Sequence, residues 1–192
     1  MKRISCEVVA VGTELLLGQI VDTNSSWIGE QLALSGIDSY FQTKVGDNPD
    51  RIKAVLRQAL DRSDVVIVCG GLGPTQDDLT RDMIAEVMGV ELILNESIAE
   101  RIEAMFAGRN RPMPENNLRQ AMVPDGAEAL PIMPGTAPGL KAQLGDKTIY
   151  AVPGVPWEMK QMVEEAILPD IRMQAGSTSV IRSKTLRTWG DS

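Results

Sequence analysis

The sequence predicts an α/β protein: a three-layer α/β/α sandwich around a mostly parallel sheet. Short apolar runs alternate along the chain with segments whose apolar residues recur at helical spacing. One of these runs, Val65–Cys69, is apolar throughout, as expected of a strand that is covered on both faces. Strands that alternate with helices usually join into a parallel sheet with helices packed on its two faces, which gives the predicted architecture.

The first half of the chain shows this alternation clearly. Residues 7–11 form a short apolar strand, and the apolar positions of residues 24–32 follow the period of a helix that Gly36 ends. Residues 39–45 alternate like a strand. Asn48 then has the character of an N-cap, because a proline follows it at the first helical position.

In the second half, the buried strand Val65–Cys69 runs into a glycine-rich loop and then into another helix. The remaining expected elements are helices at 79–88 and 98–106, a helical turn at 118–122, a last core strand at 148–152 and a helix at 159–167. We expect residues 134–139 to be a turn between strands.

Composition excludes several classes of protein. The 192 residues contain no histidine, which removes the usual general base near neutral pH and the Ser-His-Asp and Cys-His nucleophiles. The two cysteines, Cys6 and Cys69, are too few for a zinc site or a disulfide framework. Catalysis would therefore rely on carboxylates, hydroxyls, basic side chains, backbone amides and a hard cation bound by oxygen.

The charge balance also limits the partners. A net charge of -7 disfavours a nucleic-acid-binding surface, and no apolar run is long enough to cross a membrane. We therefore expect a cytoplasmic protein. We assign residues 1–171 to one domain and 172–192 to the start of a truncated following domain, because the tail is basic and alternates like a strand over 177–189.

The candidate site lies where the predicted strands end, since open α/β sheets bind ligands beyond the carboxyl ends of their strands. Four such strand ends are rich in glycine and polar residues: 12–14, 46–48, 70–75 and 153–156. The third, with Gly70, Gly71 and Gly73 before a helix, predicts an anion site made of backbone N–H groups. It matches neither the Walker A pattern nor GxGxxG.

Acidic residues accompany these loops. We expect Asp77 and Asp78 just inside the helix that follows the glycine loop, where they either complement the helix dipole or hold a hard cation beside a bound phosphate. One ligand and one cap is the arrangement we favour, because neighbouring helical residues point in different directions. Glu14 and Asp47 would complete the oxygen shell of the metal.

Five motifs, in this order and spacing, resemble the N-terminal domain of the CinA (competence/damage-inducible) family: VGTELLLGQIVDTNSSWI, CGGLGPTQDDLTRD, PENNLRQA, PGTAPG and AVPGVPWEM. That domain belongs to the molybdopterin-binding superfamily of molybdenum-cofactor biosynthesis, and the resemblance covers roughly residues 8–168. It implies a molybdopterin-binding-like fold.

The resemblance further implies metal-dependent ADP-ribose pyrophosphatase activity. The expected cofactor is a divalent metal ion: magnesium, manganese or cobalt. By this resemblance Asp78 would be the metal-binding or catalytic carboxylate and Asp47 a second acid. Glu14, from its place at a strand end, is expected to join them as a catalytic and metal-binding residue. The expected substrate-binding residues are Gly12, Thr13, Asn24, Gly70, Gly71, Gly73, Thr75, Gly154 and Pro156.

Two other functions remain open at this stage: pterin binding or adenylyl transfer, and a non-catalytic nucleotide-binding assembly domain. Nicotinamide-nucleotide amidohydrolase activity is expected only of a C-terminal domain that this sequence lacks, and a homo-oligomer is expected from the resemblance alone.

Overall fold

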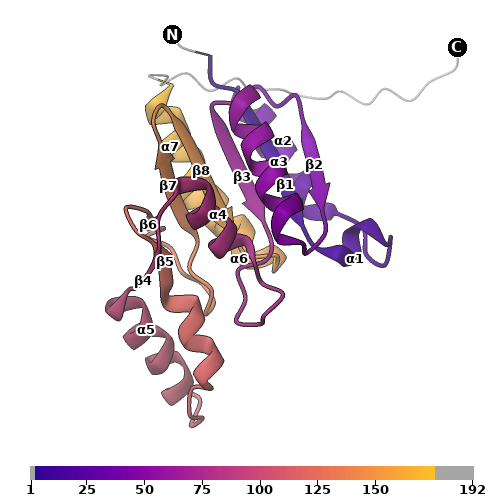
Figure 1. Cartoon of the computed structure of the whole chain (residues 1–192). Helices are drawn as coiled ribbons and strands as arrows, with labels where there is room; N and C mark the ends of the chain where they lie inside the picture. Colours follow the sequence, from indigo (N-terminus) through magenta and orange to yellow (C-terminus); the bar gives the residue numbers. More distant parts are fainter. Residues whose placement is uncertain (1–2, 176–192) are drawn as a thin grey trace, which may run out of the picture.

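A six-stranded sheet forms the centre of the computed structural model, which describes residues 3–175 (Figure 1). In spatial order its strands are β2 Gln42–Val45, β1 Cys6–Val11, β3 Val65–Cys69, β8 Lys147–Val152, β7 Leu140–Leu144 and β6 Glu128–Ala129. The first four strands are parallel, and β7 and β6 are antiparallel additions at one edge. The predicted mostly parallel sheet is confirmed.

Helices cover both faces of this sheet and make two separate apolar cores. Helices α3 Pro49–Arg62 and α4 Thr80–Met88 pack on one face, and α2 Thr23–Leu34 and α6 Pro156–Met162 pack on the other. Successive residues of β3 enter opposite cores, because side chains of a strand alternate between its faces. This explains why Val65–Cys69 is apolar at every position and confirms the three-layer sandwich.

A smaller unit projects from one end of the sheet (Figure 1). It contains the antiparallel pair β4 Leu92–Leu94 and β5 Met122–Pro124, the helix α5 Glu96–Ala107 and a 3-10 helix at Glu115–Ala121. A four-residue helix, α1 Thr13–Leu16, follows β1. Among residues 3–175, no helix is long and apolar enough to cross a membrane.

The predicted starts and stops of helices follow local chemistry. Asn48 accepts a hydrogen bond from the Arg51 backbone N–H at 3.1 Å, with Pro49 at the first helical position of α3. Gly36 and Gly89 follow α2 and α4 with positive φ angles of 70° and 73°, as helix-ending glycines do.

Two helices differ from expectation. Asp77 and Asp78 precede α4, which begins at Thr80, because Asp78 closes a turn with Thr75 ahead of the helix. The last predicted helix is divided into α6, a π-helical turn Val163–Ile167 and α7 Leu168–Gln174; Pro169, which has no N–H to donate, lies at the start of α7.

No residue ranges were predicted for the strands β4 to β7, although the turn expected at 134–139 implies the strands on its two sides, β6 and β7. For β7 a signal was present, since Gly145-Asp146 separates an alternating run from an apolar one, as a two-residue hairpin loop does. The strand predicted at 177–189 lies outside the described residues.

Candidate functional site

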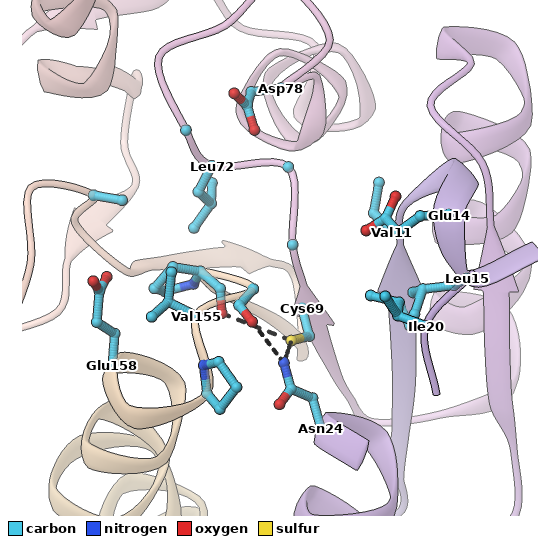
Figure 2. Close-up of a pocket in the computed structure, with 18 of the residues that line it drawn as sticks. Val11, Glu14, Leu15, Ile20, Asn24, Cys69, Leu72, Asp78, Val155 and Glu158 are labelled. Carbon is cyan, nitrogen blue, oxygen red and sulfur yellow. Dashed lines mark hydrogen bonds between the residues drawn. The ribbon is translucent and has the colours of Figure 1, made fainter. Parts of the chain in front are cut away.

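A cleft of about 540 Å³ lies beyond the carboxyl ends of β1, β3 and β8 (Figure 2). Segments that follow these three strands form most of its wall, and the 3-10 helix and the 134–139 loop complete it. The fourth expected strand end, residues 46–48 after β2, does not line it. The cleft therefore occupies the predicted edge of the sheet, but at three of the four strand ends.

The glycine loop after β3 has a backbone that other residues cannot adopt easily. Gly70 and Gly71 have φ angles of 105° and 67°, and a Cβ at these positions would collide with the Val11 carbonyl and with the Thr80 side chain, respectively. The close approach to β1 and to the start of α4 is thus the reason for both glycines.

The carbonyl groups of this loop are turned toward α4. Thr80 donates from Oγ1 to the Gly70 carbonyl at 2.7 Å and from its N–H to the Gly71 carbonyl at 3.1 Å. Arg81 Nη2 donates to the Leu72 carbonyl at 3.0 Å. Among residues 3–175, the N–H groups of Gly71, Leu72 and Gly73 have no hydrogen-bond acceptor, while all three residues line the cleft. Unpaired amides on a fixed loop can bind an anion.

A buried cation supports the same loop. Arg81 is 0% exposed, and within the described part of the chain its Nε and Nη1 atoms have no hydrogen-bond partner. Burial lowers the pKa of Arg81 to about 10, against the opposing influence of Asp82 and Asp78, so the guanidinium remains charged at neutral pH. Its positive charge favours an anion on the loop that it holds.

Asp78 closes the far end of the loop. Its Oδ2 accepts hydrogen bonds from the Thr75 N–H at 2.8 Å and from Thr75 Oγ1 at 2.6 Å. The carboxylate also lies against Gly73, where a Cβ would be 2.5 Å from Oδ2. Asp78 lines the cleft and Thr75 does not, so Thr75 acts here as a partner of Asp78.

Asp47 and Thr13 form a reciprocal pair outside the cleft. Thr13 N–H donates to Asp47 Oδ2 at 2.8 Å, and Asp47 N–H donates to Thr13 Oγ1 at 3.0 Å. This pair joins the ends of β1 and β2. Glu14 does line the cleft, and its carboxylate lies against Gly12.

The predicted oxygen shell of Asp78, Glu14 and Asp47 therefore does not come together. In the range 3–175, no group of three or more Asp, Glu, Cys or His side chains is close enough to hold a metal ion. The carboxylate of Asp47 accepts a hydrogen bond from the Thr13 N–H at the neighbouring strand end, and neither residue lines the cleft.

Asn24, at the start of α2, fixes the loop between β8 and α6. Its Nδ2 donates to the Gly154 carbonyl at 2.8 Å and to Cys69 Sγ at 3.5 Å, as the dashed lines in Figure 2 show. The Cys69 thiol in turn donates to the Pro153 carbonyl at 3.7 Å. Asn24 thus positions the cleft wall through its amide.

Taken together, most but not all of the expected residues line one cleft. Those that line it are Glu14, Asn24, Gly70, Gly71, Gly73, Asp78, Gly154 and Pro156. Those that do not are Gly12, Thr13, Asp47 and Thr75.

Sequence reasoning missed the other side of the cleft. Gln120, Thr136, Ala137 and Glu158 all line it. Glu158 follows a glycine- and proline-rich strand end by one helical turn, a signal that could have identified it. The 134–139 loop lies between β6 and β7 as expected, and it also faces the cleft.

Comparison with known proteins gives consistent matches over the described region. A family profile described as a probable molybdopterin binding domain matches residues 7–173. A CinA-like protein of a Nostoc species is 46% identical over 188 residues, which are 97% of this chain and 44% of that protein. A putative competence-damage inducible protein of Symbiobacterium thermophilum is 49% identical over 186 residues, or 96% of this chain and 44% of the relative. The chain thus spans less than half the length of these relatives.

Solved structures match the fold. The crystal structure of the protein CinA from Thermoplasma acidophilum, described as having unknown function, is 34% identical, with a TM-score of 0.80, and the match covers 88% of this chain and 98% of that one. The molybdopterin biosynthesis enzyme MoaB of Thermus thermophilus is 21% identical, with a TM-score of 0.60 over 91% of this chain and 98% of its own, and supports the fold alone.

Proposed function

Since the chain belongs to the family of probable molybdopterin binding domains, in its CinA group, we propose that it is a metal-dependent nucleotide pyrophosphatase. Its substrate would be ADP-ribose or a related nucleoside diphosphate compound. The observation that carries this proposal is the glycine loop, whose carbonyls are tied to α4 and whose free N–H groups line a cleft that also contains carboxylates.

The loop suits the diphosphate of such a substrate. The N–H groups of Gly71, Leu72 and Gly73 supply fixed donors for phosphate oxygens, and the charge of buried Arg81 adds a favourable potential. Because the loop is already held by Thr80 and Arg81, little rearrangement is needed when the anion binds.

The donor set of the cleft fits a hard divalent cation. Glu14 and Asp78 present carboxylates to the cleft, and Asp78 uses only Oδ2 in its hydrogen bonds with Thr75. A magnesium-type site needs only one or two protein carboxylates, with substrate phosphates and water as the other ligands. When bound, the cation would neutralise charge on the diphosphate and lower the pKa of a water molecule.

The proposal is tested by replacing Asp78 with Asn. Asn keeps an oxygen that can accept the Thr75 hydrogen bonds but removes the negative charge, so we expect the fold to survive and AMP release to fall at least about 100-fold. The assay is chromatography of ADP-ribose incubated with magnesium, manganese or cobalt, alongside a thermal melt.

The matched control is Asp77→Asn, because Asp77 is exposed and does not line the cleft. It should retain the wild-type rate. Undiminished turnover in the Asp78→Asn variant would remove Asp78 from the reaction. A wild-type chain that leaves ADP-ribose intact with all three metals would refute the pyrophosphatase.

Pterin binding or adenylyl transfer is the second candidate, and the matching family profile favours it. It would use the same glycine loop for a pterin pyrophosphate. Titration with molybdopterin and with ADP-ribose separates the two candidates: tight pterin binding without pyrophosphatase turnover supports the second. ADP-ribose that binds and stabilises the chain without being cleaved supports a non-catalytic assembly domain.

A further inference from the structure

Glu158, the third residue of α6, extends toward the cleft on the side away from Glu14 (Figure 2). Its carboxyl group lies directly against Gly135 of the 134–139 loop: a Cβ on Gly135 would collide with the carboxyl carbon and with both oxygens. The absence of a side chain at Gly135 is therefore what gives this carboxyl its place in the cleft wall.

Unlike Asp78, this carboxylate is not engaged by the protein. Within residues 3–175 neither of its oxygens accepts a hydrogen bond, whereas Asp78 holds Thr75. Both of its oxygens can therefore accept a hydrogen bond or a proton from a ligand or from water in the cleft. Glu14 also lacks a hydrogen-bond partner among the described residues, but its side chain is exposed to solvent, whereas Glu158 is partly buried.

Partial burial raises the pKa of Glu158 above its usual value, and burial is the cause of this shift. The charged groups on the elements around it are Glu14, Asp22, Asp78, Arg101, Arg119 and Lys160. A carboxyl group with a raised pKa is better matched to proton transfer near neutral pH than an ordinary glutamate. In a chain without histidine, such a group is the available substitute for imidazole.

We propose that Glu158 is the general base of this cleft, which removes a proton from the water molecule that attacks the diphosphate. This inference rests on the proposed pyrophosphatase function. In the step, a water O–H bond breaks and its proton passes to a Glu158 oxygen, while the water oxygen forms a bond to one phosphorus. The bridging P–O bond breaks with its electron pair on the departing phosphate, and Glu158 then releases its proton to solvent.

The first test is the pH dependence of turnover by the 192-residue chain. Wild-type kcat/KM should rise with pH through one ionisation, and Glu158→Gln should remove that ionisation and lower kcat about 100-fold. Glu158→Asp keeps a carboxyl group and should retain the ionisation with part of the rate. The matched control, Glu165→Gln, changes an exposed glutamate of the adjacent π-helical turn and should behave like wild type.

The second test needs no turnover. Calorimetry of ADP-ribose binding without metal, in two buffers of different ionisation enthalpy near pH 5.5, measures proton uptake. A diphosphate beside Glu158 disfavours its charged form, so the wild type and Glu165→Gln should take up protons and Glu158→Gln should not.

The outcomes separate the two proposals. If the wild type hydrolyses ADP-ribose and Glu158→Gln keeps the same rate, ionisation and proton uptake, Glu158 is not the base although the pyrophosphatase stands. If the wild type binds ADP-ribose with Glu158-dependent proton uptake but never cleaves it, the pyrophosphatase and the base are refuted together, and Glu158 is only a ligand contact.

Discussion

Each of three carboxylates in this cleft occupies the space that a side chain would fill at a neighbouring glycine. Glu14 lies against Gly12, Asp78 against Gly73 and Glu158 against Gly135, and in each case a Cβ on the glycine would collide with the carboxyl group. None of these three glycines lies in the left-handed region of φ, so they are required by space and not by backbone conformation. Glycine therefore has two roles in this cleft: it forms the loop with unpaired N–H groups, and it leaves space for the three carboxylates.

Gly71 is a sharper case, because both conformation and space require glycine there. In a Gly71→Ala variant, the alanine would be strained by the φ of 67°. Its Cβ would also collide with Thr80, whose hydroxyl already donates to the Gly70 carbonyl. We expect a loss of about 1–3 kcal/mol in the free energy of unfolding and weaker ADP-ribose binding. Urea unfolding and calorimetry measure these changes.

Gly108→Ala is the control for that substitution. Gly108 ends α5 with a φ of -62°, and a Cβ there would be 3.4 Å from its nearest neighbour, the Ala104 carbonyl. It should leave stability and binding near wild type. Equal behaviour of the two variants would show that the loop tolerates a side chain and that its backbone is not constrained as described.

At the scale of elements, sequence reasoning succeeds where the cause is local. The cap at Asn48 and the apolar run of β3 are determined by the residues themselves and their immediate neighbours. It fails where the cause is a contact between distant segments. Asp47 pairs with Thr13 across 34 residues, and Glu158 meets the cleft because Gly135 of another element leaves space for it. The sequence analysis proposed Asp47 and missed Glu158, because only the packing shows which of the two carboxylates lines the cleft.

Asp170 links α7 to both β7 and β8. Its Oδ2 accepts hydrogen bonds from Lys141 at 2.6 Å and from the Tyr150 hydroxyl at 2.6 Å. Burial alone would raise the pKa of Asp170, but these hydrogen bonds outweigh it and lower the pKa below the usual 3.8. The corresponding stability is present above pH 3.8 and is lost as the pH falls to the lowered value.

Asp170→Asn should therefore be less stable than wild type at pH 7, by about 0.5–1 kcal/mol, and the difference should shrink as the pH falls below 3.8. Urea unfolding at a series of pH values measures this. Asp146→Asn, in the exposed turn between β7 and β8, should show no such pH-dependent difference. A constant difference between Asp170→Asn and wild type at all pH values would mean that the ionised carboxylate is not what stabilises α7.

At the scale of the whole molecule, the reactivity of the two cysteines measures whether the core around the central sheet is closed. Cys6 in β1 and Cys69 in β3 are 1% and 4% exposed and belong to the same apolar core. Burial raises the pKa of Cys6 far above its usual value and that of Cys69 to about 12, so neither forms the reactive thiolate in the folded state. Exposure of the Cys6 sulfur requires opening of the core between the sheet and α2, and Cys69 is almost fully covered although it lines the cleft.

We therefore expect an aromatic disulfide reagent at pH 8 to modify the folded chain at least about 100-fold more slowly than the unfolded chain. In urea, both thiols should become reactive at the midpoint seen by circular dichroism. Cys6→Ala and Cys69→Ala, each with one remaining thiol, assign the two rates. Rapid modification of Cys69 while the dichroism is unchanged would contradict the expected protection of both thiols. Cys69 lines the cleft beside Asn24, so its sulfur would then be reached from the cleft. In that case the site would open by local unfolding, and a bound nucleotide should slow Cys69 without slowing Cys6.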